Sequence, residues 1–192
     1  MGKALAISNA WTHIICAEEL RGHAHLGPAS THLILAVEEA VKARVLHKWP
    51  ALIEVMTVRQ LEDLLYTHPV RHEIAQLDSM PRALRAEIAL WTVDHPDQEL
   101  NRATLTRLFV RHPEAFPVTW AKNAEVERQR GMRVDWDGRV WRSPKEITES
   151  HYSRRYGRCL EFVVRTAALV GTLDEIKDEL AETGWEIDQE EW

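Results

Sequence analysis

"LILAVEEAVKARVL", residues 33–46, predicts a helix that is apolar on nearly every side, and such a helix is normally buried. In a projection at about 100° per residue from Leu33, apolar side chains cover most of the circle. Glu38, Lys42 and Glu39 fall together at about 140°, 180° and 240°. The stretch therefore places three charges on one narrow stripe of an otherwise apolar helix.

Two interpretations of this stripe are open. Glu38 and Lys42 are four residues apart, so they can form an ion pair along a partly solvated helix face, worth under about 0.5 kcal/mol. Leu35 and Leu46 lie within the same stripe, however, which favours a buried polar cluster. A buried ion must be paired, because an isolated one costs several kcal/mol. In that case Glu39 needs a basic partner from another helix.

The segments around this stretch are also helical in pattern. Apolar residues recur about every 3.6 positions over residues 3–20, and Gly22 and Gly27 bound the loop that follows. Pro28 suits the first turn of the next helix, and Pro50 predicts its end. We expect these two helices to pair antiparallel. Further helices are predicted over residues 58–66 after a Thr57 cap, 69–91 with a break at 79–81, 97–111, 117–131, from Ser143 or Thr148 to Gly171, and 173–182.

The pattern changes to alternation in "MRVDWDGRVW", residues 132–141. Asp137 and Gly138 between two short alternating runs predict a β-hairpin near residues 132–142. The expected fold is therefore an all-α bundle with one small hairpin. We expect a single domain over residues 1–192, with a short C-terminal helix and an acidic tail from about residue 172.

Composition limits the function only broadly. The net charge is −6, so the overall charge does not indicate a nucleic-acid partner. The chain has 18 arginines and 6 lysines, and arginine suits local contacts with phosphate. Cys16 and Cys159 lie far apart in apolar helical patterns and are interpreted as reduced core thiols. The sequence shows no signal peptide and no membrane-length apolar run, so the expected location is the cytoplasm.

A metal or cofactor is not expected. The histidines and acidic residues near the N-terminus follow no tight ligand spacing, with no "HExxH" motif and no cysteine cluster. A glycine-rich phosphate loop and a "GxSxG" nucleophile motif are absent as well.

Two blocks of the sequence resemble the AbiV-type abortive infection proteins, a branch of the HEPN superfamily of helical bundles. "ASTHLILAVEEAVKARVL" matches the paired glutamates and lysine of the family's second helix at Glu38, Glu39 and Lys42. "RQRGMRVDWDGRVWRSPKEIT" matches the family's hairpin and the helix start after it, with Asp135 and Trp136 in the hairpin and Ser143 and Pro144 at the helix start.

The resemblance also points to a histidine on the next long helix. "VRHEIAQL" supplies Arg71 and His72 there, while the lysines that often follow in the family are replaced by Ile74 and Ala75. We expect Glu38 to pair with Lys42, and Glu39 to reach Arg71 or His72.

Many proteins of the superfamily are metal-independent endoribonucleases in which four to six residues of any type separate an arginine from the histidine that follows it. Arg107 and His112 show this spacing, but the composition alone gives roughly three such matches by chance. The pair could hold a scissile phosphate and move the proton of a ribose 2′-hydroxyl, with His72 as a further candidate. Alternatively, "RHP" is simply a helix C-terminus, where basic side chains offset the negative end of the helix dipole.

The resemblance implies antiphage defence by abortive infection. The chain would act as a toxin-like effector that blocks translation or cleaves RNA, as a homodimer, in response to a phage-encoded activator. The competing hypothesis is a non-catalytic sensor or binding module that captures a phage or ribosomal component.

Overall fold

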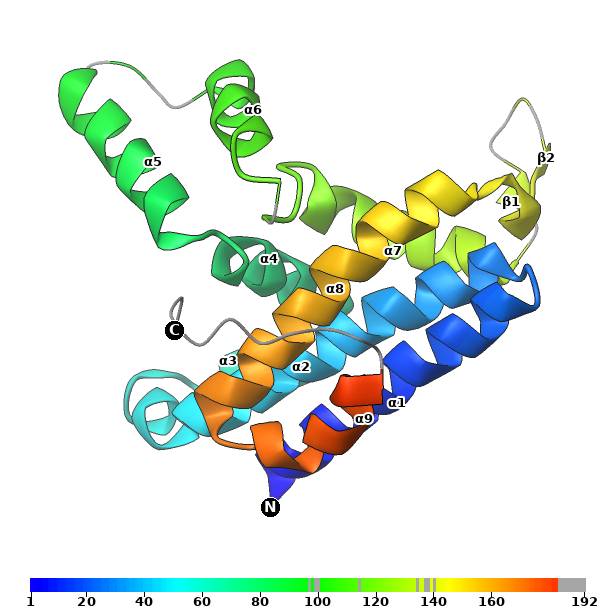
Figure 1. The fold of residues 1–192 in the computed structure, drawn as a ribbon. Coiled ribbons are helices and arrows are strands. Elements are labelled where there is room, and N and C mark those ends of the chain that lie inside the picture. The colour runs from blue at the N-terminus through cyan, green and yellow to red at the C-terminus, as the bar shows by residue number, and fades with distance from the viewer. Residues whose placement is uncertain are drawn as a thin grey trace.

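Two long helices joined by a short loop form the centre of the fold. The computed structural model describes residues 1–96, 98, 101–113, 115–133, 135–136, 139 and 141–182. α1 (Gly2–Gly22) runs antiparallel to α2 (Leu26–Val55), and α8 (Glu149–Val170) packs along both (Figure 1). Their facing side chains form the main hydrophobic core, in which Ile7, Leu33 and Val163 are fully buried. The predicted all-α fold and the antiparallel pair are confirmed.

Shorter helices also pack against α2. α3 (Val58–Tyr66) and α4 (His68–Asp78) follow it directly, and α7 (Trp120–Met132) packs against both α2 and α4. The N-cap predicted at Thr57 is confirmed, and it forms a capping box with Gln60. α4 ends at Asp78, so the predicted break at residues 79–81 is confirmed. The packing of α4 and α7 on α2 brings residues from three helices around Glu38.

The predicted end of α2 at Pro50 is wrong, because the helix continues to Val55. Proline removes one N–H from the helix ladder, and its ring disfavours the preceding turn. Trp49 and Leu52, on either side of Pro50, nevertheless pack against the main core. Burial of these side chains outweighs the local cost and carries the helix through the proline.

α5 (Arg82–Asp94) and α6 (Arg102–Val110) form a separate arm beside the main bundle (Figure 1). They pack chiefly on each other around a small second core that contains Leu84, Leu108 and Phe109. α6 begins later than the predicted residue 97, because the side chain of Asn101 caps it by accepting a hydrogen bond from Thr104 N at 3.0 Å. Residues 97, 99 and 100 lie outside the described residues.

Near the predicted hairpin, β1 (Asp135–Trp136) pairs antiparallel with β2 (Trp141–Arg142), with Trp136 opposite Trp141. The turn at Asp137 and Gly138 lies outside the described residues, as do the side chains of both strands, so the hairpin as a whole stays a prediction.

Both predicted N-caps after this segment are used. Ser143 caps the short helix η1 (Pro144–Glu146), and Thr148 caps α8.

The C-terminal part of the bundle agrees with the prediction from the sequence. Gly171 terminates α8 in the left-handed conformation with φ 71°, as a C-terminal glycine commonly does. η2 (Leu173–Glu175) and α9 (Lys177–Glu182) follow, and residues 183–192 of the predicted acidic tail lie outside the described residues.

Cys16 and Cys159 are free thiols, as expected. Within the part of the chain that the structure describes, no helix has the length and hydropathy needed to cross a membrane.

Candidate functional site

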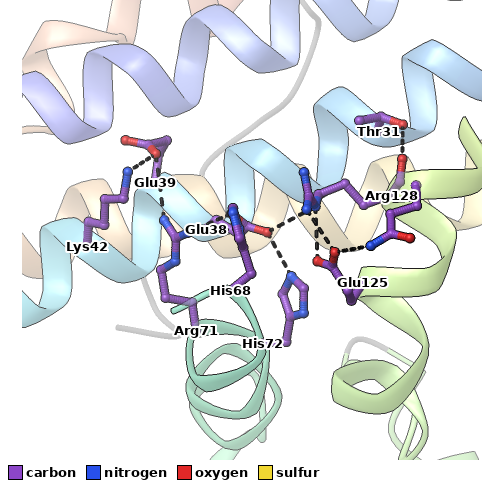
Figure 2. Close-up of polar contacts among 10 residues, drawn as sticks. Thr31, Glu38, Glu39, Lys42, His68, Arg71, His72, Glu125 and Arg128 are labelled. Atoms are coloured by element: carbon purple, nitrogen blue, oxygen red, sulfur yellow. Dashed lines mark hydrogen bonds and ion pairs between the residues drawn. The ribbon is translucent and has the colours of Figure 1, made fainter. Parts of the chain in front are cut away.

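The carboxylate of Glu38 lies at the centre of a buried polar cluster between α2, α4 and α7 (Figure 2). Its side chain is only 1% exposed. We call Glu38 and its four basic neighbours, His68, Arg71, His72 and Arg128, the Glu38 cluster. The buried interpretation of the charged stripe is therefore confirmed for Glu38.

Each oxygen of Glu38 has more than one partner. Oε1 lies 2.8 Å from Nε2 of His72 and 3.9 Å from Nε of Arg128. Oε2 lies 2.6 Å from Nδ1 of His68 and 3.1 Å from Nη2 of Arg71. A carboxylate only accepts hydrogen bonds, so every one of these nitrogens can face it as a donor. The arrangement neutralises a charge that would otherwise be very costly at this depth.

Local sequence explains how α4 and α7 supply these partners. His68 and His72 are four residues apart on α4, and Arg71 lies between them, so all three project toward α2. On α7, Arg128 is held by Glu125, with Nη2 and Oε1 2.9 Å apart. Thr31 Oγ1 of α2 also donates to the backbone carbonyl of Arg128 at 2.9 Å. The three helices are thus locked together through one polar layer.

The predicted pair of Glu38 with Lys42 is wrong, whereas the predicted approach of Glu39 to Arg71 is present as a long ion pair. Lys42 forms a short ion pair with Glu39, three residues before it, and not with Glu38. Glu39 meets Arg71 only at 4.0 Å. Glu38 faces α4 and α7, where the basic residues lie, whereas Glu39 and Lys42 line a surface hollow together with Leu5 of α1. The surroundings of the helix, and not the spacing along it, decide which glutamate is neutralised by which cation.

Ionised Glu38 is favoured by its surroundings. Burial alone would raise its pKa, but the hydrogen bond from His72 and the positive charge of Arg71 outweigh burial and lower the pKa below its ordinary value of 4.5. His72 is fully buried, and its Nδ1 has no hydrogen-bond partner among the described residues. The tautomer with its proton on Nε2, directed at Glu38, fits these contacts.

The lowered pKa predicts how stability changes with pH. The ionised Glu38 contributes stability above its unfolded pKa, and this contribution is lost as the pH falls through the lower pKa of the folded state. We therefore expect the gap in unfolding free energy between wild type and Glu38→Gln to be widest at about pH 7 and to narrow toward about pH 3. Urea unfolding at several pH values measures it. The exposed Glu54→Gln is the control, and an unchanged gap would contradict the assignment.

A metal ion is a poor fit for this cluster, although Glu38, His68 and Glu125 offer ligand atoms within 4.8 Å of one another. The same carboxylates already pair with Arg71 and Arg128, whose permanent positive charges would repel a cation. The chemistry of this donor set is that of a neutralised ionic network.

The candidate catalytic residues lie in two different places. His72 is buried against Glu38 and does not reach the surface, so its contacts are those of a packing residue. Arg107 lies on α6 of the arm, exposed, and its Nη2 donates to Thr104 Oγ1 at 3.2 Å. His112 follows the same helix, with Nε2 3.3 Å from Oε1 of Glu87 on α5.

Sequence reasoning missed two members of the Glu38 cluster, His68 and Arg128, and the Glu125 that holds Arg128. Signals for both members were present. His68 is four residues before His72 on the predicted helix, which puts the two on one face. Arg128 opens the "RQRG" run that precedes the predicted hairpin.

Comparison with known proteins places these features in a family. A family model described as AbiV, of the HEPN type, matches residues 2–162, which is most of the chain and includes every member of the Glu38 cluster. No curated protein and no solved structure matches the chain. This chain belongs to the AbiV-type HEPN family.

Proposed function

We propose that this protein is a toxin-like effector of abortive infection that stops translation in the infected cell by cleaving RNA. Family membership implies the antiphage role. The cleavage chemistry is our proposal, and it rests on one observation, the group of charged side chains at the end of α6.

That group combines a carboxylate, an imidazole and two guanidinium groups. Glu87 Oε1 lies 3.3 Å from Nε2 of His112, and its Oε2 lies 3.6 Å from Nη1 of Arg111. Arg107 lies one helical turn before Arg111 and is exposed. A carboxylate that orients a histidine beside arginines is an arrangement suited to phosphate chemistry.

In the proposed reaction, His112 accepts the proton of a ribose 2′-hydroxyl while Arg107 and Arg111 bind the neighbouring phosphate. The 2′-oxygen attacks phosphorus, the bond to the 5′-oxygen breaks, and that oxygen leaves with a proton from solvent or from a second acid. Cleavage in this way needs no metal. A homodimer would place two such groups close together, and a phage-encoded activator would control them.

The test is incubation of the purified protein with total RNA and with tRNA, with and without extract from phage-infected cells. We expect cleavage by the wild type, and a loss of about 100-fold or more in His112→Ala, because general acid–base groups contribute about that much. Arg107→Ala should also lose activity. The matched controls are His47→Ala and Arg59→Ala, which remove exposed residues of the same types elsewhere.

Two outcomes would contradict the proposal in different ways. Cleavage that survives both His112→Ala and Arg107→Ala would show that the catalytic group lies elsewhere. Protection of cells against phage without any RNA cleavage would favour the alternative, a binding module that captures a phage or ribosomal component. The net charge of −6 is consistent with that alternative, since phosphate neutralisation supplies most non-specific RNA affinity.

A further inference from the structure

A second basic site lies in a pocket of about 370 Å³ between the start of α7 and the first half of α8. Its lining includes three arginines and a histidine from α8 together with Trp120 and Glu127 of α7. The α8 residues are His151, Arg154, Arg155 and Arg158. This pocket shares no residue with the Glu38 cluster or with the group at the end of α6.

Arg155 is the buried arginine of the pocket lining. It is 8% exposed, and its Nη2 pairs closely with Glu127 and lies 3.1 Å from Nε2 of His151. Nη1 is buried and has no hydrogen-bond partner among the described residues. A buried guanidinium N–H without an acceptor is costly, and an anionic oxygen is the partner that best satisfies it.

Arg154 and Arg158 are each held in place by a hydrogen bond to a backbone carbonyl. Arg154 Nε donates to the carbonyl of Ser150 at 3.1 Å, and Arg158 Nε donates to the carbonyl of Pro113 at 2.7 Å. Each fixes its guanidinium through Nε, and within the described part of the chain the terminal N–H groups stay available to a ligand. Among the described residues of the lining, Glu127 is the one acidic side chain, and it is paired with Arg155. Three arginines against one carboxylate leave a surplus of positive charge that suits a phosphate.

The other side of the pocket is aromatic. Trp120 stacks on Phe116 with ring centroids 4.3 Å apart, and both residues line the cavity. Nε1 of Trp120 is buried without a hydrogen-bond partner among the described residues. A pocket of this volume accommodates a small ligand, and a phosphate beside an aromatic wall is the chemistry of a nucleotide.

We propose that this pocket binds a nucleoside monophosphate group, with the phosphate on Arg154, Arg155 and Arg158 and the base toward Trp120. The group is either a free nucleotide or the 5′-phosphorylated end of an RNA strand. Binding here does not depend on RNA cleavage, so this inference can hold where the proposed cleavage fails, and the reverse.

Calorimetric titration of the full chain tests the site with four probes: inorganic phosphate, adenosine 5′-monophosphate, and one short RNA with a 5′-phosphate or a 5′-hydroxyl. We expect the monophosphate to bind more tightly than inorganic phosphate. If the RNA end is the source, the 5′-phosphorylated strand binds more tightly than its 5′-hydroxyl counterpart; if the free nucleotide is the source, the two strands bind alike.

The double variant Arg154→Ala/Arg158→Ala should weaken binding by about 100-fold or more, since it removes two of the three charged groups that would bind the phosphate. Both side chains reach the surface, so the variant is expected to fold, and circular dichroism checks this. Arg59→Ala, an exposed arginine on α3, is the matched control. The proposal is overturned if no probe binds, if inorganic phosphate binds as tightly as the monophosphate, or if Arg59→Ala weakens binding as much as the double variant.

Discussion

Replacing Glu38 with alanine should lower the free energy of unfolding by about 3–5 kcal/mol. The substitution removes the carboxylate that pairs with His68 and Arg71 and that lies near Arg128, and it takes away the hydrogen-bond partner of the fully buried His72. Removing one partner of a buried ion pair is costly, because the charge of the other partner stays buried without an opposite charge beside it. The total free energy of unfolding of a globular domain is only about 5–15 kcal/mol, so this loss is a large part of it.

Urea unfolding followed by circular dichroism measures the effect. Glu54→Ala, an exposed glutamate on the same helix, is the control and should leave the midpoint nearly unchanged. Glu38→Gln keeps the shape and part of the hydrogen bonding, so its loss should be smaller than that of Glu38→Ala. A loss below about 1 kcal/mol in Glu38→Ala would show that the Glu38 cluster adds little to stability.

Gly131→Ala is the second substitution with a large expected effect, a destabilisation of about 1–3 kcal/mol or more. A Cβ at Gly131 would lie 2.1 Å from Oγ1 of Thr31 and 2.4 Å from the backbone oxygen of Gly27. The second contact is with backbone, so α7 and α2 would have to move apart. That movement would also strain the bond from Thr31 to the carbonyl of Arg128.

Gly157→Ala is the matched comparison and should change stability in the opposite direction. Gly157 lies within α8, and a Cβ there would meet nothing within 4 Å. Alanine in an open helical position is favoured over glycine by about 0.5–1 kcal/mol. Thermal unfolding of the two variants should move the midpoint down for Gly131→Ala and up for Gly157→Ala. A rise in both would mean that α2 and α7 separate easily at this point.

Local signals in the sequence were sufficient for most helix ends. Thr57, Thr148 and Gly171 act within one turn of the chain, so their effect on the backbone can be predicted without knowledge of the fold. Pro50 predicted the end of α2 too early, because the helix is continued to Val55 by the packing of neighbouring side chains on the core, which depends on the fold. Asn101 was a usable N-cap in the sequence, but the helix was predicted to begin four residues earlier, at residue 97.

The site was predicted less completely. The stripe of Glu38, Glu39 and Lys42 was visible in the helix projection, and the family motif pointed to α4. Arg128 was missed because it is 90 positions from Glu38 in the sequence, and only the packing of α7 on α2 brings it close. The arginine-rich pocket on α8 was not foreseen at all, since it needs the aromatic wall of α7 opposite it.

The division into two hydrophobic cores has a consequence for hydrogen exchange. The arm of α5 and α6 buries few side chains of its own, so its amide groups are protected by a local opening equilibrium and not by the stability of the whole bundle. Amides in α2 and in the second half of α8, deep in the main core, should exchange only when the bundle unfolds. His112 and Arg107 therefore belong to a part of the molecule whose geometry is less costly to change than that of the main bundle.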